Sequence, residues 1–264
     1  MLSIMGFPQV VGLGLVLAVA GGGLTTSWPR SESVQGWERY AAAVEARRAG
    51  EQRDARRFLA LDFLPGAATE RRTVMVGNLV VQSMDARVDV PSAMVHHWRG
   101  AVFLAGATLE RLMATLETEA PPTGPEVLNA AVLSRRPRAM RLFLRLQRTK
   151  FVTVVYNTEH EVTFARDTAG RASSVSVATK IAEVADANTP SEHELRSGDD
   201  SGYLWRLNAY WRYQVVPGGV IAECESLSLS RDVPFGLGYI AGPLIARAAR
   251  ESMTRALEEI RKRG

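Results

Sequence analysis

Residues 203–231 read YLWRLNAYWRYQVVPGGVIAECESLSLSR, and these residues contain the clearest strand pattern in the chain. It contains two segments rich in aromatic and branched side chains, which is typical of β-strands, with Pro217-Gly218 between them. If that dipeptide forms a two-residue turn, the residues on its two sides face each other and the pairing continues outward. Arg212 then faces Glu223, and such a cross-strand pair contributes a few tenths to about 1 kcal/mol. The sequence therefore predicts an antiparallel hairpin with a fixed register.

The same register divides the side chains of the hairpin between two faces. On one face large side chains oppose small ones, and the pairs are Trp205 with Ser230, Leu207 with Ser228, and Trp211 with Cys224. The other face carries Arg206, Asn208, Arg212 and Glu223. We expect water to cover that polar face. Small residues opposite rings leave space, so we expect a cavity over the first face.

An amphipathic helix follows the hairpin and is expected to cover its aromatic face. Apolar residues recur at helical spacing from Leu237 to Ile260, and most charged residues lie outside that stripe. A long helix laid over a curved antiparallel sheet buries both apolar surfaces. The predicted fold class is α+β, a curved antiparallel sheet wrapped around a long C-terminal helix.

The remaining strands are expected earlier in the chain. β-rich or alternating segments occupy residues 94–104, 127–133, 140–164 and 173–184, and a short helix begins at Thr108. Arg148-Thr149-Lys150 interrupts the long segment 140–164, where the strand register and the inward-facing residues are left open. Residues 185–202 are rich in Asp, Glu, Ser and Pro, which indicates an exposed loop.

The composition excludes several classes of protein. Of 264 residues, 46% are hydrophobic, which is too many for a disordered chain. Thirty-two Lys and Arg against 28 Asp and Glu leave a net charge of +4, which does not indicate a nucleic-acid partner. The single cysteine, Cys224, excludes an internal disulfide and a cysteine-based zinc site. We expect neither a metal nor a cofactor.

Residues 1–20 are expected to be a signal peptide. No charged side chain precedes Arg30, and the apolar run Val10–Ala20 ends in Ala18-Val19-Ala20, which resembles a signal-peptidase site. We therefore expect an exported protein, periplasmic or secreted. The alternative is an uncleaved N-terminal segment that anchors the protein in the membrane.

Residues 21–90 are expected to form a helical extension. Helical spacing of apolar residues runs from Ser33 to about Phe63, with Ser31 and Ser33 as candidate N-caps. Pro65-Gly66 ends the pattern. This segment carries the arginines Arg47, Arg48, Arg53, Arg56 and Arg57. They could contact a membrane surface transiently, but we interpret them as a solvated face. Whether the extension covers the cavity or only tethers the domain is left open, as is the oligomeric state.

Four segments of residues 91–264 carry a resemblance to a known superfamily. They are HHWRGAVFLAGATLE from His96, TVVYNTEHEV from Thr153, SGYLWRLNAYWRYQ from Ser201 and VIAECESLSLSRDVPFGLGYIAGPL from Val220. Together with the order of elements, they resemble the START-like, or SRPBCC, superfamily, and within it an exported bacterial branch. The resemblance implies a START-like domain over residues 91–264 with a helix-grip fold. It also implies a pocket for a hydrophobic ligand, and members include lipid carriers and polyketide cyclases. It implies no catalytic residue, because no shared catalytic motif defines the superfamily.

The predicted function is binding, and carriage or sensing, of a hydrophobic, lipid-like small molecule between the sheet and the C-terminal helix. The expected ligand-binding residues are Trp205, Leu207, Trp211, Tyr213, Ser226, Ser228, Leu244, Ile245 and Ala248. Rings would form one wall of the pocket, the serines would line the opposite side, and the helix would close it.

The alternative function is an enzyme of the cyclase or dehydratase type. A buried acid or base is needed for it, and the candidates are His160, Glu159 and Glu161. We favour an ordinary role for the two glutamates, as partners of Arg or Lys across the sheet. His96 and His97 are adjacent on a strand and so point to opposite faces, which argues against a shared metal ion.

Overall fold

The computed structural model describes residues 29–84, 88, 90–149, 153–167, 170–232 and 238–264, and the side chains of all of these except 149 and 238–245. The expected signal peptide, residues 1–20, lies outside these ranges.

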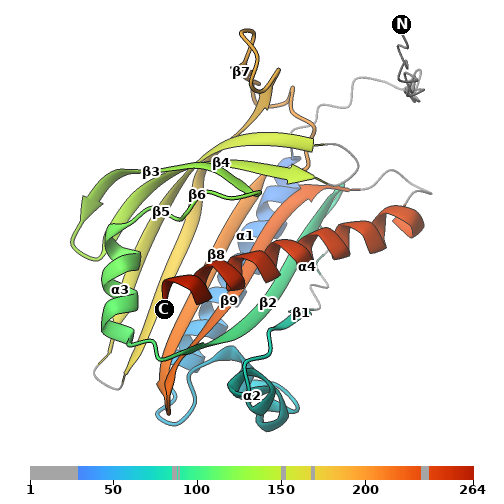
Figure 1. The fold of residues 1–264 in the computed structure, drawn as a ribbon. Coiled ribbons are helices and arrows are strands. Elements are labelled where there is room, and N and C mark those ends of the chain that lie inside the picture. The colour runs from blue at the N-terminus through green and yellow to red at the C-terminus, as the bar shows by residue number, and fades with distance from the viewer. Residues whose placement is uncertain (1–28, 85–87, 89, 150–152, 168–169, 233–237) are drawn as a thin grey trace, which may run out of the picture.

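One curved antiparallel sheet forms the centre of the structure (Figure 1). Its nine strands follow the order β1-β2-β9-β8-β6-β5-β4-β3, and β7 pairs with β6 in addition. The strands are β1 (Val80–Ser83), β2 (Ala93–Ala105), β3 (Val127–Arg136), β4 (Ala139–Thr149), β5 (Thr153–Arg166), β6 (Arg171–Ala185), β7 (His193–Glu194), β8 (Arg206–Val216) and β9 (Gly219–Arg231).

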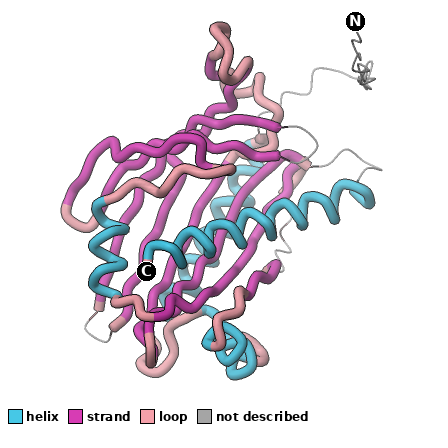
Figure 2. Tube along the Cα trace, in the orientation of Figure 1, coloured by secondary structure: helices cyan, strands magenta, loops and turns pink. Residues whose placement is uncertain are grey.

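Helices lie on both faces of this sheet (Figure 2). They are α1 (Ser31–Gln52), the short 3-10 helix η1 (Ala60–Phe63), α2 (Ala67–Met75), α3 (Leu109–Thr118) and α4 (Gly238–Arg263). In Figure 1, α4 crosses the front of the sheet and α1 lies behind it. The predicted class, an α+β helix-grip fold with a long C-terminal helix, is confirmed.

The hairpin of β8 and β9 has the register predicted from the sequence. Trp211 pairs with Cys224, and Arg212 pairs with Glu223. Gly218 has a φ of 83°, in the left-handed region that glycine adopts without the usual steric cost. The turn at Pro217-Gly218 therefore sets the pairing, as predicted.

The inner face of the sheet is the face that carries α4. Met253, Leu257 and Ile260 of α4 are buried in the main hydrophobic core together with side chains of β2 and β9. Gly100 of β2 permits this close approach, because a Cβ there would lie 2.6 Å from Leu257 Cδ1. The part of α4 whose side chains are described thus lies against the sheet and does not project from it.

One carboxylate connects α4 to the opposite half of the sheet. Glu126, just before β3, accepts hydrogen bonds from Ser252 and Arg255 of α4, the latter at 2.6 Å. Arg148 of β4 donates to the same carboxylate at 3.2 Å. The helix is therefore held from both sides of the curved sheet.

The outer face of the hairpin is not covered by water, and this sequence prediction is wrong. α1, η1 and the segment between them cover it, and Arg212, Glu223 and Glu225 are at most 1% exposed. Arg212 donates to Glu51 of α1 at 2.6 Å rather than to Glu223. Glu223 accepts instead from Arg99 of β2 at 3.0 Å and from the backbone N–H groups at the start of η1. Burial raises the pKa of the Glu223 carboxyl, against the opposing charges of Arg99 and Arg212.

Glu225 is the centre of this buried charge network. Arg47 and Arg48 of α1 donate to it, and His97 of β2 contacts it at 3.2 Å. Burial alone would raise the pKa of Glu225, but the His97 contact and the neighbouring arginines hold that pKa below its usual range. The interpretation of the arginines between residues 47 and 57 as a solvated face is therefore wrong for Arg48, which is 4% exposed, while Arg53, Arg56 and Arg57, which follow α1, are exposed.

The predicted helix from Ser33 to Phe63 divides into two elements. α1 ends at Gln52, and Asp54 then accepts the backbone N–H groups of Arg56 and Arg57 through its side chain. Such side-chain hydrogen bonds compete with helical ones, which explains the break. The predicted N-caps are also wrong. Arg30 occupies the N-cap position, and Ser33 donates to the carbonyl of Pro91 at 2.5 Å.

Candidate functional site

A row of four paired side chains, three of them small, crosses the inner face at the middle of the sheet. Ser226 of β9 pairs with Trp98 of β2 and with Ala209 of β8, and Ala209 pairs with Ser176 of β6. Trp98 lies two residues from Gly100, so these four side chains point to the face that α4 covers. All four are nevertheless only half-buried. We call Trp98, Ser226, Ala209 and Ser176 the central row, and their partial exposure shows that this part of the inner face is incompletely covered.

Two aromatic rings of β8 lie beside the central row. The rings of Trp211 and Tyr213 are parallel, with centroids 6.1 Å apart. Tyr213 is 1% exposed, its hydroxyl lies 3.5 Å from Ser174, and burial raises the pKa of its phenol. Trp211 is half-buried, so it is the ring of this pair that a ligand on the inner face can reach.

The titratable side chain of His160 contacts a member of the central row. It lies on β5, 3% exposed, with Nε2 2.9 Å from Thr158 Oγ1 and Nδ1 3.3 Å from Ser176 Oγ. Burial, and then the charge of Arg148, lower its pKa to about 4. Its imidazole is therefore neutral at pH 7 and has a member of the central row as neighbour.

The structure places most of the predicted site residues with described side chains on the inner face. Leu207, Ser226 and Ser228 are half-buried there. Ala248 is half-buried in α4. Leu244 and Ile245 belong to α4, but their side chains lie outside the described residues.

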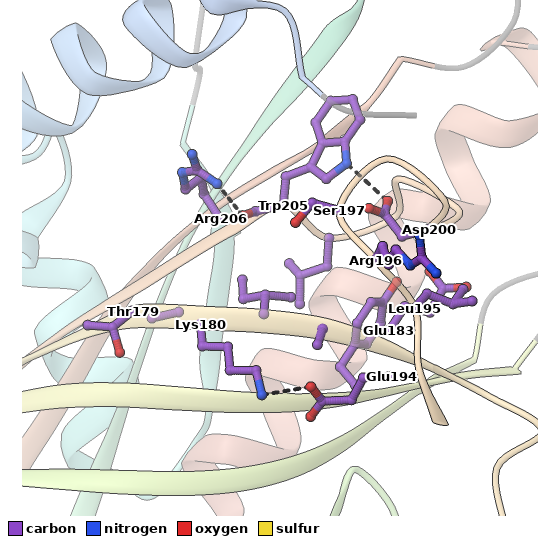
Figure 3. A pocket seen from close by; sticks show the side chains of 15 residues that line it. Thr179, Lys180, Glu183, Glu194, Leu195, Arg196, Ser197, Asp200, Trp205 and Arg206 are labelled. Atoms are coloured by element: carbon purple, nitrogen blue, oxygen red, sulfur yellow. Dashed lines mark hydrogen bonds and ion pairs between the residues drawn. The ribbon is translucent and has the colours of Figure 1, made fainter. Parts of the chain in front are cut away.

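The prediction that Trp205 shares the inner face with Trp211 is wrong. Trp205 precedes β8, is 7% exposed, and packs in a cluster with Trp37 and Val44 of α1 on the outer side. Its indole N–H donates to Asp200 at 3.2 Å (Figure 3). The strand alternation that orients Trp211 ends at Arg206, and residues before a ladder need not follow it.

Sequence reasoning missed three members of the central row, Trp98, Ala209 and Ser176. The hairpin register contained the signal for Ala209, because it pairs with Ser226. Trp98 and Ser176 lie on strands that pair with the hairpin across long loops, so no local turn fixes their faces.

The two glutamates of the alternative enzyme lie on the outer face. Glu159 pairs with Arg141 at 2.7 Å, and Glu161 pairs with Arg136 at 3.0 Å. This is the arrangement that the sequence favoured, with arginines across the sheet as partners. Neither carboxylate faces the inner side, so the only candidate acid or base left from the sequence is His160.

The adjacent histidines point to opposite faces, as expected for a strand. His96 contacts Ser230 on the inner face at 2.9 Å, and His97 belongs to the buried charge network of the outer face. Within the described ranges, no group of three or more His, Cys, Asp or Glu side chains is placed to hold a metal ion. Among the helices that the structure describes, none is both long and apolar enough to cross a bilayer.

No protein-family model matches the chain, and no curated protein matches it. Solved structures do resemble it. The STAR-related lipid transfer protein of Xanthomonas axonopodis is 16% identical with a TM-score of 0.39, and the match covers 66% of this chain and 98% of that one. The lipid transfer and protein localization domain of human StarD13 is 9% identical with a TM-score of 0.39, covering 74% and 94%. The Zhui aromatase/cyclase from Streptomyces sp. R1128 is 9% identical with a TM-score of 0.39, covering 64% and 93%.

The chain has a helix-grip fold. The strand order and the position of α4 on the inner face establish this architecture. At 9–16% identity and a TM-score of 0.39, these similarities assign neither a family nor a function to this chain.

Proposed function

We propose that the protein binds a hydrophobic, lipid-like small molecule on the inner face, beneath α4, and carries or senses it. The observation that carries this proposal is the central row. Its four side chains point to the face that α4 covers, yet they are only half-buried. Three of the four, Ser226, Ala209 and Ser176, are also small. Surface that is apolar, concave and incompletely filled is the usual setting for a small-molecule site.

The chemistry around the row suits an apolar ligand with few polar groups. Trp98 and Trp211 offer ring faces, and Leu207 adds aliphatic surface. The hydroxyls of Ser226 and Ser228 can orient one polar end. These residues, with Tyr213 and the helix residues Leu244, Ile245 and Ala248, make up the proposed binding site.

The expected affinity is moderate. Burying about 400 Å² of apolar ligand surface yields roughly 10 kcal/mol at about 25 cal/mol/Å². Association costs consume about half of this, which leaves roughly 5 kcal/mol and a Kd of a few tenths of a millimolar.

Native mass spectrometry of the protein purified from its own host, followed by titration with a panel of lipids, tests the proposal. Retained or added apolar ligands are the expected result. Ser226→Trp fills the middle of the central row and should abolish binding, and the milder Ala209→Leu should weaken it. Thr163→Trp, at an exposed position of β5, is the matched control and should bind normally. Absence of any apolar ligand from the folded wild-type protein would refute the proposal.

The second candidate function is a cyclase-type enzyme that uses His160. It is favoured by one observation, an inward-facing neutral imidazole with no carboxylate partner among the described residues. A pKa of about 4 makes His160 a weak base, and hydrogen bonds occupy both ring nitrogens, so we place this function second. Turnover of a polyketide-like substrate that is lost in a folded His160→Gln variant would reverse that order.

Export of the protein is part of the same proposal, and a transient contact of the exposed Arg53, Arg56 and Arg57, which follow α1, with a membrane surface belongs to it. N-terminal sequencing of the mature protein tests the export. A chain that begins at Gly21 supports export with cleavage after Ala20, and an intact N-terminus contradicts the cleavage.

A further inference from the structure

The sheet opens between β6 and β8. The last pair joining these strands is Val177 with Asn208, and β6 next gains a partner where Val184 pairs with Glu194 of β7. Between these points, residues 178–182 of β6 have β5 on one side and no described strand on the other. The edge of β6 is therefore free in the middle of the sheet.

A β-bulge explains why the two strands separate. The pairing of β5 with β6 shifts between Glu159 and His160, and Thr179 is the extra residue on β6. A bulge bends its strand and increases the local twist. Here the bulge comes directly after the last pair with β8, so β6 bends away from β8 at that point.

A pocket of about 660 Å³ occupies the opening (Figure 3). Six consecutive residues of β6, Ala178–Glu183, line it on one side, and Leu204–Arg206 line it on the other. Consecutive residues of a strand point to opposite faces. A pocket bordered by all six therefore lies along the backbone edge of β6, in the plane of the sheet, between residues whose side chains point to the two faces.

The inner end of the pocket is apolar. Tyr156, Ile181 and Leu204 line it, and they pack in one cluster with Leu144 and Leu207. Leu207 belongs to the proposed binding site on the inner face. The inner end of the pocket thus adjoins that site, separated from it by side chains.

The outer end of the pocket is charged. Lys180 and Glu194 form an ion pair of 2.7 Å there, with both side chains more than one-third exposed (Figure 3). Arg196 is exposed and also lines the pocket. The far wall is fixed, because Asp200 accepts the backbone N–H of Gly202 at 2.7 Å as well as the Trp205 indole.

Tyr156 is held at the inner end without a hydrogen bond. Its ring is 1% exposed, and its hydroxyl is buried with no hydrogen-bond partner among the described residues. Its neighbour Ser201 donates its own hydroxyl proton to Glu183 at 2.5 Å. The polar neighbour of the Tyr156 hydroxyl is the hydroxyl of Ser201, which lowers the pKa of the phenol against the effect of burial. No hydrogen bond of good geometry opposes rotation of the ring.

We infer that the opening between β6 and β8 is a portal through which the apolar ligand enters and leaves the inner face, with the Tyr156 ring as its inner gate. The inference rests on the proposed function. A slender ligand, such as a single alkyl chain, fits the passage, and the charged outer end keeps the opening hydrated when it is empty. The opening lies on the β6–β8 side of the sheet, whereas α4 packs on β1, β2 and β9.

A reversible plug tests the portal. Ala182→Cys places a thiol in the lining of the pocket, at a half-buried position. A bulky methanethiosulfonate reagent then blocks the opening, and dithiothreitol removes the block. Ser134→Cys, at an exposed position of β3, carries the same label as the matched control. Wild-type protein treated with the reagent controls for Cys224, which is buried.

The readout is stopped-flow fluorescence with cis-parinaric acid, a fatty acid that brightens when bound. We expect the plug to slow association and dissociation together by about tenfold or more, while the Kd stays nearly constant. Reduction should restore both rates. Ala182→Trp should slow both rates without labelling.

The possible results separate the portal from the proposed function. Wild-type rates in the plugged protein would overturn the portal and leave the binding function standing. A changed Kd with an unchanged dissociation rate would also overturn it, because the pocket would then be the binding site itself. Failure of every form to bind the fatty acid would refute the proposed function, and the portal with it.

Discussion

The pKa of His160 measures how strongly water is excluded from its surroundings on the inner face, because burial is the main cause of its low value. The imidazole is held between Thr158 and Ser176, and the nearby charge that acts on it, Arg148, is positive. Both effects oppose protonation, so the folded protein has a His160 pKa of about 4 against 6.5 for an unperturbed histidine.

The sign and size of the consequence follow by linkage. Between about pH 6.5 and pH 4 the unfolded chain binds a proton at this histidine that the folded chain does not bind, so stability falls as the pH falls. At about 1.4 kcal/mol for each pKa unit, the free energy of unfolding falls by about 3 kcal/mol in total. At pH values well above the pKa of His160 in the unfolded chain, none of this decrease occurs. By pH 4.5, most of this loss should have occurred.

Urea unfolding of the wild type and of His160→Gln, at several values between about pH 7 and pH 4.5, measures the effect. Other groups titrate in both proteins and cancel in the difference. The wild type should lose about 2–3 kcal/mol more than the variant over this range. Parallel pH profiles would refute the reasoning, because they would mean that His160 titrates alike in the folded and unfolded states.

Three further predictions concern the outer network, the helix contact and the gate. Arg212→Met leaves buried carboxylates without their partner and should lower the free energy of unfolding, measured with urea, by about 3–5 kcal/mol. Arg141→Met, at an exposed pair, should lower it by less than about 1 kcal/mol, and equal losses would contradict the burial of the network. Glu126→Gln should accelerate amide hydrogen exchange in α4 at low salt, and the acceleration should be much smaller at high salt. Unchanged exchange would mean that this carboxylate does not hold the helix. Tyr156→Phe removes a buried hydroxyl that has no hydrogen bond of good geometry, so it should raise the free energy of unfolding by about 1 kcal/mol. A decrease of about the same size would show that the hydroxyl does make a stabilising hydrogen bond.

The sequence predicted the elements that local chemistry determines. The register of β8 and β9 followed from Pro217-Gly218, since a two-residue turn allows one pairing. The helical spacing after Leu237 predicted α4, and the interruption at Arg148-Thr149-Lys150 marked the division of residues 140–164 into β4 and β5. In each case a short segment of chain contains the whole signal.

The errors came from contacts between segments far apart in the sequence. Arg212, Glu223 and Glu225 alternate with apolar residues as solvent-facing side chains do, and the pattern alone cannot distinguish water from a charged helix as their partner. The complementary signal was present in Arg47 and Arg48 of α1, but only the fold brings the two sets together.

Residues of the candidate site were predicted correctly only where they pair within the hairpin of β8 and β9. Leu207, Trp211, Ser226 and Ser228 follow from that register, and all four lie on the inner face. Trp205 lies beyond the end of the strand, so the alternation no longer applied to it. The bulge at Thr179 has no distinctive sequence, so the opening between β6 and β8 could not be predicted.

Photo-crosslinking tests the binding site on the inner face most directly. The protein is incubated with a fatty acid that carries a diazirine in its chain, irradiated, digested and mapped by mass spectrometry. Crosslinks should concentrate on Trp98, Ala209, Trp211 and Ser226 and should disappear when unlabelled fatty acid competes. Crosslinks confined to α1 and the outer surface, or crosslinks that competitor does not remove, would contradict a ligand bound between the sheet and α4.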